Sequence, residues 1–258
     1  MHEAAATGPA TPSTAKAKRA PVTLAVDVGG SNVKAMLLDR VGRPVSERLK
    51  QATPRPATPR AVTEKIVAIA RTIGPFDRVS VGFPGVIVDG CVMTAANLDG
   101  KWKGYDLRSN LHKRLSKPVH LTNDADMQGF GAIAGKGVEL TITLGTGVGS
   151  ALFVDGVLVP NLELGHHAFR KGETYEEQLG QRALEKVGKK RWRRRLKLAI
   201  DQMLRVFWPR HLYVGGGNSR LINFKLPRNV TAIPNEAGIL GGIALWRGKH
   251  DPHDTHES

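Results

Sequence analysis

Short apolar runs alternate with glycine-rich and polar corners along most of this chain. In the stretch TLAVDVGGSNVKAMLLD, two apolar runs flank a polar corner, which predicts strands at Thr23–Val28 and Val33–Asp39 joined as a β-hairpin. The pattern recurs where a predicted strand at Glu139–Leu144 runs into glycines within 145–149 and then into an apolar run at Ala151–Val154. More strands and helices follow each hairpin. This coarse internal duplication predicts two α/β domains that face each other across a cleft.

The spacing of apolar residues places the other elements around these hairpins. Apolar residues at helical spacing predict helices at Ala61–Ile73, Asp106–Leu115, Met127–Ala134, Thr174–Val187, Arg191–Phe207 and Asn235–Trp246. Short apolar runs predict further strands at Val45–Leu49, Arg78–Phe83, Gly90–Thr94, Val119–Leu121, Val157–Val159 and His211–Val214.

A length of 258 residues suits one large domain or two small ones. We expect an N-terminal α/β domain at 21–122 and a C-terminal α/β domain at 123–235, with the helix at 236–248 packing back on the first domain. Polar, proline-containing ends predict flexible tails at 1–20 and 249–258.

The composition narrows the classes of protein that need to be considered. No run of eighteen apolar residues occurs, so no membrane partner is expected, and the N-terminus has no apolar stretch of signal-peptide type. Cys91 is the only cysteine, which excludes intramolecular disulfides and cysteine-rich zinc sites. These features favour a reducing, cytoplasmic setting.

The chain is strongly basic, with 38 Lys and Arg against 23 Asp and Glu, a net charge of +15. Such an excess favours polyanionic partners, although it is also compatible with simple solubility. Part of it lies in the run GKKRWRRRLKL, whose basic residues include Lys189, Lys190, Arg191, Arg193, Arg194 and Arg195. The run is interpreted either as a solvated helix face or as a binding patch for polyphosphate or nucleic acid.

The first glycine corner can do more than turn the chain. It contains Gly29, Gly30, Ser31 and Asn32, which are ordinary turn residues, so a plain hairpin is one interpretation. The other is that bare backbone N–H groups of the corner approach a phosphate. Asp27 could then hold a hydrated Mg²⁺ beside that phosphate.

Familiar nucleotide motifs are absent, but glycine corners recur. The chain has no G-x-x-x-x-G-K-[ST] motif, and its second corner leads into a strand instead of the helix that a dinucleotide fingerprint requires. Main-chain approach to phosphates is nevertheless possible at three places, the first corner, Gly145–Gly147 and Gly215–Gly217. Three such corners in an α/β chain favour phosphoryl transfer, which depends mainly on positioning and on neutralising charge.

Phosphoryl transfer to a hydroxyl also needs a base, and Asp124 is the candidate. It follows the strand predicted at Val119–Leu121, where a loop opens. Asn123 beside it could bind a sugar hydroxyl, while Asp126 is the rival acid. The alternative for Asp124 is an Asx turn or the N-cap of the following helix.

A second polar loop adds candidate sugar ligands. The sequence ELGHH carries Glu163 and His166, whose side chains suit sugar hydroxyls as acceptor and donor. A metal site would need a third ligand, so polyol binding is preferred to zinc. Asn97, in TAANLDG, is a further loop amide that could bind a polyol or simply form a turn.

Taken together, these segments resemble the ROK family of sugar kinases, in the actin-like ATPase superfamily. DVGGSNVK looks like the first phosphate loop of that family, TLGTGVGSAL like its second and YVGGGNS like its adenosine-side loop. NDAD looks like the segment with the catalytic aspartate and ELGHH like the sugar-binding element. FPGV, TAANLDGKW, PNLELGHH and NEAGILGG are similar to the polyphosphate glucokinase branch.

The resemblance implies a two-domain actin-like (ribonuclease H-like) fold with an interdomain cleft, Mg²⁺, no zinc, and a homodimer. It implies catalysis by Asp124 and sugar contacts from Asn97, Asn123, Glu163, His166 and either Glu176 or Glu177. The phosphate and nucleotide contacts that it implies are Asp27, Gly29, Gly30, Ser31, Asn32, Lys34, Thr143, Gly145, Thr146, Gly147, Gly215, Gly216, Gly217 and Asn218.

The function expected on this basis is a glucokinase that transfers a phosphoryl group from inorganic polyphosphate, with ATP or GTP as further donors, to the 6-hydroxyl of glucose. One alternative is an ATP-dependent ROK hexokinase for mannose or glucosamine. Another is a non-catalytic sugar sensor that binds nucleic acid. The intact Asp27, Asp124 and glycine corners favour an enzyme, so a nucleic-acid partner is not expected.

Overall fold

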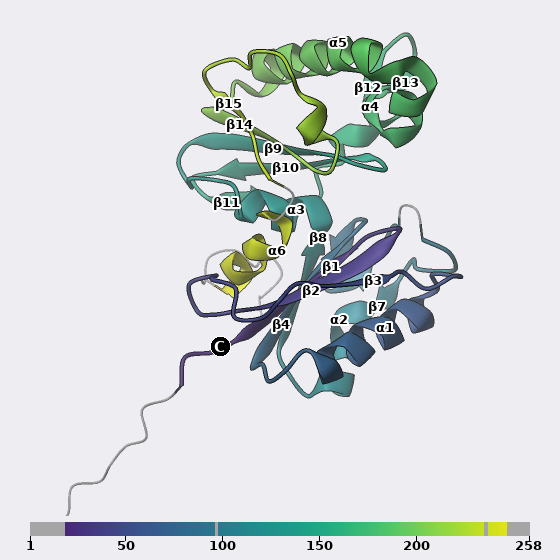
Figure 1. Cartoon of the computed structure of the whole chain (residues 1–258), viewed down its shortest axis with the longest axis vertical. Coiled ribbons are helices and arrows are strands. Elements are labelled where there is room, and N and C mark those ends of the chain that lie inside the picture. The colour runs from purple at the N-terminus through teal and green to yellow at the C-terminus, as the bar shows by residue number, and fades with distance from the viewer. Residues whose placement is uncertain (1–18, 96–97, 235–236, 247–258) are drawn as a thin grey trace, which may run out of the picture.

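Two five-stranded sheets form the framework of this computed structural model, which describes residues 19–95, 98–234 and 237–246 (Figure 1). The first sheet has the order β3-β2-β1-β4-β8, with β1 at Thr23–Val28, β2 at Asn32–Leu38, β3 at Leu49–Ala52, β4 at Arg78–Phe83 and β8 at Val119–Asn123. The second has the order β11-β10-β9-β14-β15, with β9 at Val138–Leu144, β10 at Val148–Val154, β11 at Val157–Val159, β14 at His211–Gly215 and β15 at Val230–Ala232.

The two sheets repeat one pattern of strand pairing. In the first, β1 pairs antiparallel with β2 and parallel with β4. In the second, β9 pairs antiparallel with β10 and parallel with β14. The outer strands continue each pattern, with β3 and β11 antiparallel and β8 and β15 parallel to their neighbours. Both predicted hairpins and the internal duplication are confirmed.

The helices are α1 at Pro59–Thr72, α2 at Leu107–Leu115, α3 at Asp124–Phe130, α4 at Tyr175–Leu179, α5 at Gln181–Phe207 and α6 at Ala237–Leu240. Short 3-10 turns span Leu164–His166, Ser219–Leu221 and Gly241–Trp246. Minor strands are β5 at Ile87–Val88, β6 at Cys91–Val92, β7 at Tyr105–Asp106, β12 at Ala168–Arg170 and β13 at Glu173–Thr174. In Figure 1, α1 and α2 cover one face of the first sheet, α4 and α5 cover the far face of the second, and α3 and α6 lie between the sheets.

The helices expected at Thr174–Val187 and Arg191–Phe207 are divided differently, because α4 ends before Gly180 and α5 continues through the non-helical Gly188. The strand expected at Gly90–Thr94 spans only Cys91–Val92.

Other expected elements differ from the observed ones for identifiable reasons. The strand expected at Val45–Leu49 begins only at Leu49, because the segment before it makes an isolated bridge between Leu38 and Pro44, a residue without a backbone N–H. Helix α3 starts at Asp124, three residues before the prediction, because the Asn123 side chain caps it.

The last helix is also shorter than expected. It is divided into α6 and the 3-10 turn Gly241–Trp246, while Asn235 lies outside the described residues. Ile239 and Ile243 of this segment pack against Ala25, Met36 and Leu38. The C-terminal segment therefore covers a face of the first sheet, although in the sequence it comes after the strands of the second sheet.

The two sheets have separate apolar cores. One core joins β1, β2, β4 and β8 to α1 and α2, with Phe83 and Trp102 among its large members. The other joins β9 and β14 to α4 and α5, and Trp192 is fully buried in it. Two smaller apolar clusters, which include residues of α3 and of the C-terminal segment, fill part of the space between the sheets, and the rest is open to polar residues and a ligand.

Candidate active site

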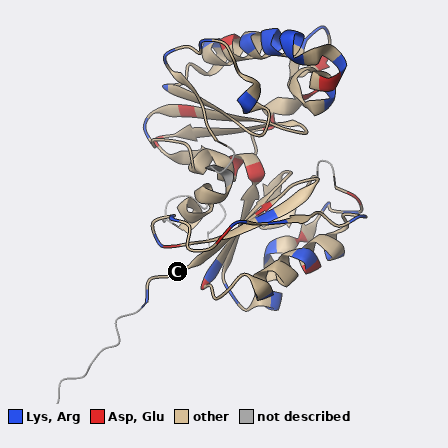
Figure 2. Cartoon of the chain, in the orientation of Figure 1, with Lys and Arg blue, Asp and Glu red and all other residues tan. Residues whose placement is uncertain are grey.

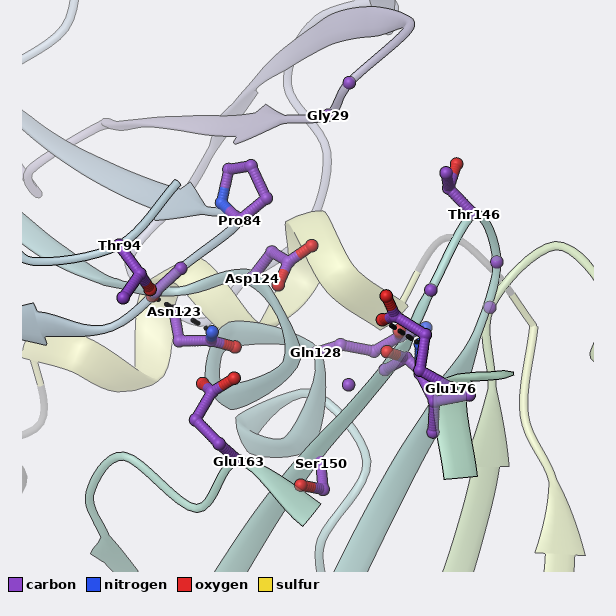
Figure 3. A pocket seen from close by; sticks show the side chains of 18 of the residues that line it. Gly29, Pro84, Thr94, Asn123, Asp124, Gln128, Thr146, Ser150, Glu163 and Glu176 are labelled. Atoms are coloured by element: carbon purple, nitrogen blue, oxygen red, sulfur yellow. Dashed lines mark hydrogen bonds between the residues drawn. The ribbon is translucent and has the colours of Figure 1, made fainter. Parts of the chain in front are cut away.

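Both glycine corners face one cleft of about 620 Å³ between the sheets (Figure 3). Predicted site residues that line it are Asp27, Gly29, Gly30, Lys34, Asn123, Asp124, Thr143, Gly145, Thr146, Gly147, Glu163, His166, Glu176, Gly216 and Gly217. These residues come from six separate stretches of the chain. Tertiary structure therefore brings together what the sequence keeps far apart.

The first corner carries an ion pair. Asp27 on β1 lies opposite Lys34 on β2, and Lys34 Nζ donates to Asp27 Oδ2 over 2.8 Å. Both side chains are mostly buried, with exposed fractions of 20% and 23%. The N–H of Gly29 donates to the carbonyl of Asn32 over 2.9 Å, so this amide closes the turn and is not free for a phosphate.

The second corner has no charge of its own and is braced from behind. The N–H of Gly145 donates to the carbonyl of Gly147 over 3.0 Å, so it also closes its own turn. Glu176 accepts from the N–H of Val148 at 3.2 Å, and a Cβ on Gly147 would collide with the Glu176 carboxylate. A side chain at position 147 would therefore have to push the Glu176 carboxylate away from the corner.

Asp124 is the first residue of α3 and is half-buried in the cleft. The Asn123 side chain caps the helix, with Oδ1 accepting from the N–H of Ala125 at 2.7 Å and from that of Asp126 at 3.4 Å. The capping role considered for Asp124 therefore belongs to Asn123. Because Asn123 Nδ2 also donates to the carbonyl of Gly85 at 3.1 Å, one amide hydrogen is left for a ligand.

The environment of Asp124 changes its acidity. Burial, followed by repulsion from Asp27, raises its pKa to about 7, and Glu163 adds to the effect. A carboxyl with a pKa near the working pH is well matched to accepting and releasing a proton. Burial likewise raises the pKa of Asp126 to about 8, but this side chain accepts from Thr122 Oγ1 at 3.2 Å and does not line the cleft.

Glu163 and His166 lie on another side of the same cleft. Glu163 directly precedes the 3-10 turn that contains His166, and their side chains are 3.6 Å apart. Burial raises the pKa of Glu163, with a further contribution from Glu176, while His166 acts in the opposite sense. Figure 3 shows Glu163 beside Asn123 and Asp124, an arrangement that can bind several hydroxyl groups of one small polyol.

Several predicted residues do not line the cleft. Glu177 forms the capping box of α4 with Thr174, so its role differs from that of Glu176. Asn218 braces the second corner, because its Nδ2 donates to the carbonyl of Gly145 at 3.3 Å and to Gln181 Oε1 at 3.0 Å. Residues in neighbouring turns and strand ends that also do not line it are Ser31, Asn32 and Gly215. Asn97 lies outside the described residues.

The basic run belongs to α5, which covers the far side of the second sheet (Figure 2). Lys189, Lys190, Arg191 and Arg194 are exposed. By contrast, Arg193 donates to the carbonyl of Leu221 at 2.6 Å and Arg195 to that of Gln178 at 3.2 Å, so part of the run is structural.

The start of α5 nevertheless contacts the cleft. The N–H of Gln181 donates to the carbonyl of Thr146 at 3.1 Å, and Gly188 has the non-helical φ of 72° where α5 is interrupted. The exposed basic side chains therefore lie along a helix whose first residue contacts the second corner.

Sequence reasoning missed other residues of the cleft, among them Thr94, Gln128 and Ser150. Ser150 Oγ donates to the carbonyl of Leu162 and accepts from the N–H of Leu164, so it fixes the loop that carries Glu163. Gln128 follows Asp124 by four residues. A polar residue at i+4 from the candidate base on a buried helix is a signal that could have found it.

No group of three or more potential metal ligands occurs among the described residues. Asp27 and Asp124 repel each other across the cleft, however, and this carboxylate pair fits a divalent cation that takes its other ligands from water and phosphate.

The family model described as "ROK family" matches residues 23–174, which include both glycine corners and Glu163. The chain belongs to the ROK family. A polyphosphate glucokinase from Mycobacterium tuberculosis (strain H37Rv) is 34% identical over 256 residues, a match that covers 91% of this ROK chain and 95% of the relative.

Solved structures agree with this assignment. The inorganic polyphosphate/ATP-glucomannokinase from Arthrobacter sp. strain KM is 35% identical with a TM-score of 0.78, and the match covers 88% of this chain and 100% of that one. A ROK glucokinase from Streptomyces griseus, in complex with glucose and AMPPNP, is 22% identical with a TM-score of 0.75, covering 87% and 98%. The chain therefore has the actin-like ATPase fold of ROK sugar kinases. The described helices include none with the length and apolar character needed to cross a membrane.

Proposed function

We propose that this ROK protein is a polyphosphate glucokinase, which transfers a phosphoryl group from inorganic polyphosphate to the 6-hydroxyl of glucose. The observation that carries the proposal is the place of Asp124, between two glycine corners and beside Glu163, with its pKa raised to about 7. The relatives named polyphosphate glucokinase and polyphosphate/ATP-glucomannokinase support the same substrate pair.

In the proposed reaction, Asp124 accepts the proton of the 6-hydroxyl as its oxygen attacks the terminal phosphorus. A new P–O bond forms to the sugar, and the bond to the rest of the donor breaks and leaves its electron pair on the donor's phosphate oxygen. Gly30 and Thr146, each next to a turn-closing glycine, line the cleft, and in the proposal their backbone amides bind the donor while Lys34 adds positive charge.

A divalent metal, proposed to be Mg²⁺, would be held through water by Asp27. When bound, it would neutralise negative charge on the reacting phosphates. Lys34 pairs with Asp27 in the cleft wall, so its ammonium group offsets the charge of this carboxylate.

For the sugar, we propose contacts from Glu163, His166 and the remaining amide hydrogen of Asn123. Glu176 lies at the junction of the sugar and phosphate sides, because it braces the second corner. The predicted contact from Asn97 remains part of the proposal. Because the Arthrobacter relative is a glucomannokinase, mannose is the second sugar to consider.

Long polyphosphate chains extend beyond any cleft of this size, and α5 offers a continuation. This helix begins in contact with Thr146 and carries four exposed basic residues, Lys189, Lys190, Arg191 and Arg194. A polyanion that leaves the second corner along α5 would meet these side chains in turn. The proposed patch thereby gives long chains an advantage over ATP or GTP.

The test is a matrix of donors and sugars, with polyphosphate, ATP and GTP against glucose, mannose and glucosamine. The proposal expects glucose 6-phosphate with polyphosphate as the preferred donor. Preference for ATP with mannose or glucosamine would instead favour a ROK hexokinase of other specificity. No transfer for any pair, together with salt-dependent duplex binding, would favour a sugar-sensing nucleic-acid binder.

The cellular setting that goes with this activity is cytoplasmic carbohydrate metabolism, with glucose entering glycolysis as its phosphate. A homodimer is proposed as the assembly on the family resemblance. Sedimentation of the purified chain tests that assembly independently of the activity.

A further inference from the structure

Among the described residues, two buried side-chain polar atoms have no hydrogen-bond partner: Gln128 Nε2 and Thr141 Oγ1. A buried donor without a partner is unfavourable, so each such atom in a folded protein calls for an explanation. The two differ in position. Gln128, which is 6% exposed, lines the cleft, whereas Thr141 is fully buried in β9 and does not.

Gln128 lies on the side of the cleft where the phosphoryl donor is proposed to bind. A Cβ on Gly215 would lie 2.8 Å from Gln128 Nε2, so the amide packs directly against the glycine-rich end of β14. Figure 3 shows the Gln128 side chain directed toward the side where Glu176 and Thr146 lie, with Glu163 on the opposite side. The amide thus faces the second glycine corner and Glu176, and points away from Glu163.

We propose that the Gln128 carboxamide donates a hydrogen bond to a phosphoryl oxygen of the bound donor. The inference rests on the proposed function, in that the cleft must accept a phosphorylated donor. The terminal torsion of a glutamine is broad, so a rotation can turn the NH₂ group toward the cleft. Since this donor is neutral, it can serve a phosphate without affecting the charge balance around Asp124.

The helix gives this contact a defined relation to the base. Asp124 and Gln128 are four residues apart on α3, so they lie on one helix face about one turn, or roughly 5.4 Å, apart along the axis. A rigid turn of helix therefore sets the distance between the group that accepts the proton and the group that holds the phosphate. Such positioning contributes strongly to phosphoryl transfer.

The test compares Gln128→Met with Thr141→Val. Each substitution removes a buried polar atom that lacks a partner, so both variants are expected to melt at the same temperature as the wild type or higher. Only Gln128→Met should weaken use of the donor, with kcat/KM for polyphosphate and ATP about ten- to a hundredfold lower, as expected for a hydrogen bond to a charged group. The KM for glucose should stay within about twofold of the wild type, a range well below the effect of one such bond.

The inference would be overturned if Gln128→Met and Thr141→Val had the same donor kcat/KM, whether both equalled the wild type or both fell below it. If Gln128→Met does not fold, Gln128→Glu keeps the shape and places a carboxyl near the phosphate. It should lose donor kcat/KM at least as strongly.

A binding measurement separates this inference from the proposed function. Tripolyphosphate and ATP should raise the melting temperature of the wild type and of Thr141→Val, and raise that of Gln128→Met by less. This pattern in a protein that transfers no phosphoryl group would support the inference while refuting the proposed function. Equal shifts in all three proteins would refute the inference whatever the activity.

Discussion

The two glycine corners occupy equivalent places in a duplicated scaffold but differ in chemistry. Asp27 stands two residues before Gly29 on β1, and Thr143 stands two residues before Gly145 on β9. Across each hairpin, Asp27 pairs with Lys34 and Thr143 with Gly149. The first corner therefore brings an ion pair to the cleft, whereas the second brings uncharged backbone. The same strand arrangement can produce both corners because the sheet fixes the path of the turn. The side chains next to the turn then determine whether the corner is charged.

The largest expected effect comes from Asp124, which belongs to neither corner but lies between them. Asp124→Asn should lower kcat by about 10²- to 10⁴-fold, because the amide cannot accept the hydroxyl proton. Glucose binding, measured by calorimetry, should persist. The matched control is Asp126→Asn, since Asp126 is buried two residues away and does not line the cleft. Near-native turnover by Asp124→Asn would refute the base assignment.

Removing the charge of the first corner tests the comparison directly. Asp27→Asn should reduce kcat/KM by about 10²-fold, the scale on which a preorganised electrostatic group acts, and raise the Mg²⁺ concentration needed for half-maximal rate. Thr143→Val, at the equivalent position, should have a much smaller effect because no charge is lost. Steady-state rates across a Mg²⁺ titration measure both, and equal losses would mean that the corners do not differ in role.

The second corner should depend on close packing and not on charge. Gly147→Ala places a Cβ against the Glu176 carboxylate, and we expect a rise in donor KM of about tenfold, in line with the cost of overpacking. Gly145→Ala is the control, because its added Cβ meets no heavy atom within 4 Å. If the two variants have the same donor KM, the bracing by Glu176 is unimportant.

The smallest effect is a shift in pH dependence. Because Asp124 must be ionised to act as the base, kcat/KM should rise with pH through about 7 and then level off. Repulsion from Asp27 contributes to the raised pKa, so Asp27→Asn should move the midpoint to lower pH. A midpoint that moves upward would contradict the stated cause.

The same pKa affects stability, with a definite sign. The folded state holds the Asp124 proton up to about pH 7, whereas an ordinary carboxyl releases it near 3.8. The contribution of this group to the free energy of unfolding is therefore largest below pH 3.8 and is lost as the pH rises to 7. Asp124→Asn should remove that part of the pH dependence in urea unfolding.

Much of the fold could be predicted because local signals agreed with the tertiary structure. The apolar runs around Gly29 and Gly145 identified both hairpins, and helical spacing identified α1 and α2. Failures occurred where a tertiary contact overrode the local pattern. Val45 is apolar but 54% exposed, because the segment around it meets β2 only through an isolated bridge between Pro44 and Leu38, and regular pairing begins at Leu49.

The candidate site could be predicted only in part, for a similar reason. Residue type and motif pointed to Asp27, Asp124 and Glu163, which line one cleft. The sequence could not show that Glu176 braces the second corner, although the capping-box spacing Thr174-x-x-Glu177 distinguishes Glu177 from it. Nor could it show that Gln128 lacks a partner, which depends on the packing around it.

The path of the C-terminal segment has a consequence for how the chain is made. Ser80 Oγ, in the middle of the first sheet, donates to the carbonyl of Gly242 over 2.6 Å, and Trp246 Nε1 donates to Ser80 Oγ over 2.8 Å. A ribosome emits residue 80 long before residue 242. The first sheet thus keeps an uncovered apolar face until residues 239–246 have been made, and nascent chains that stall before them present this apolar surface to chaperones.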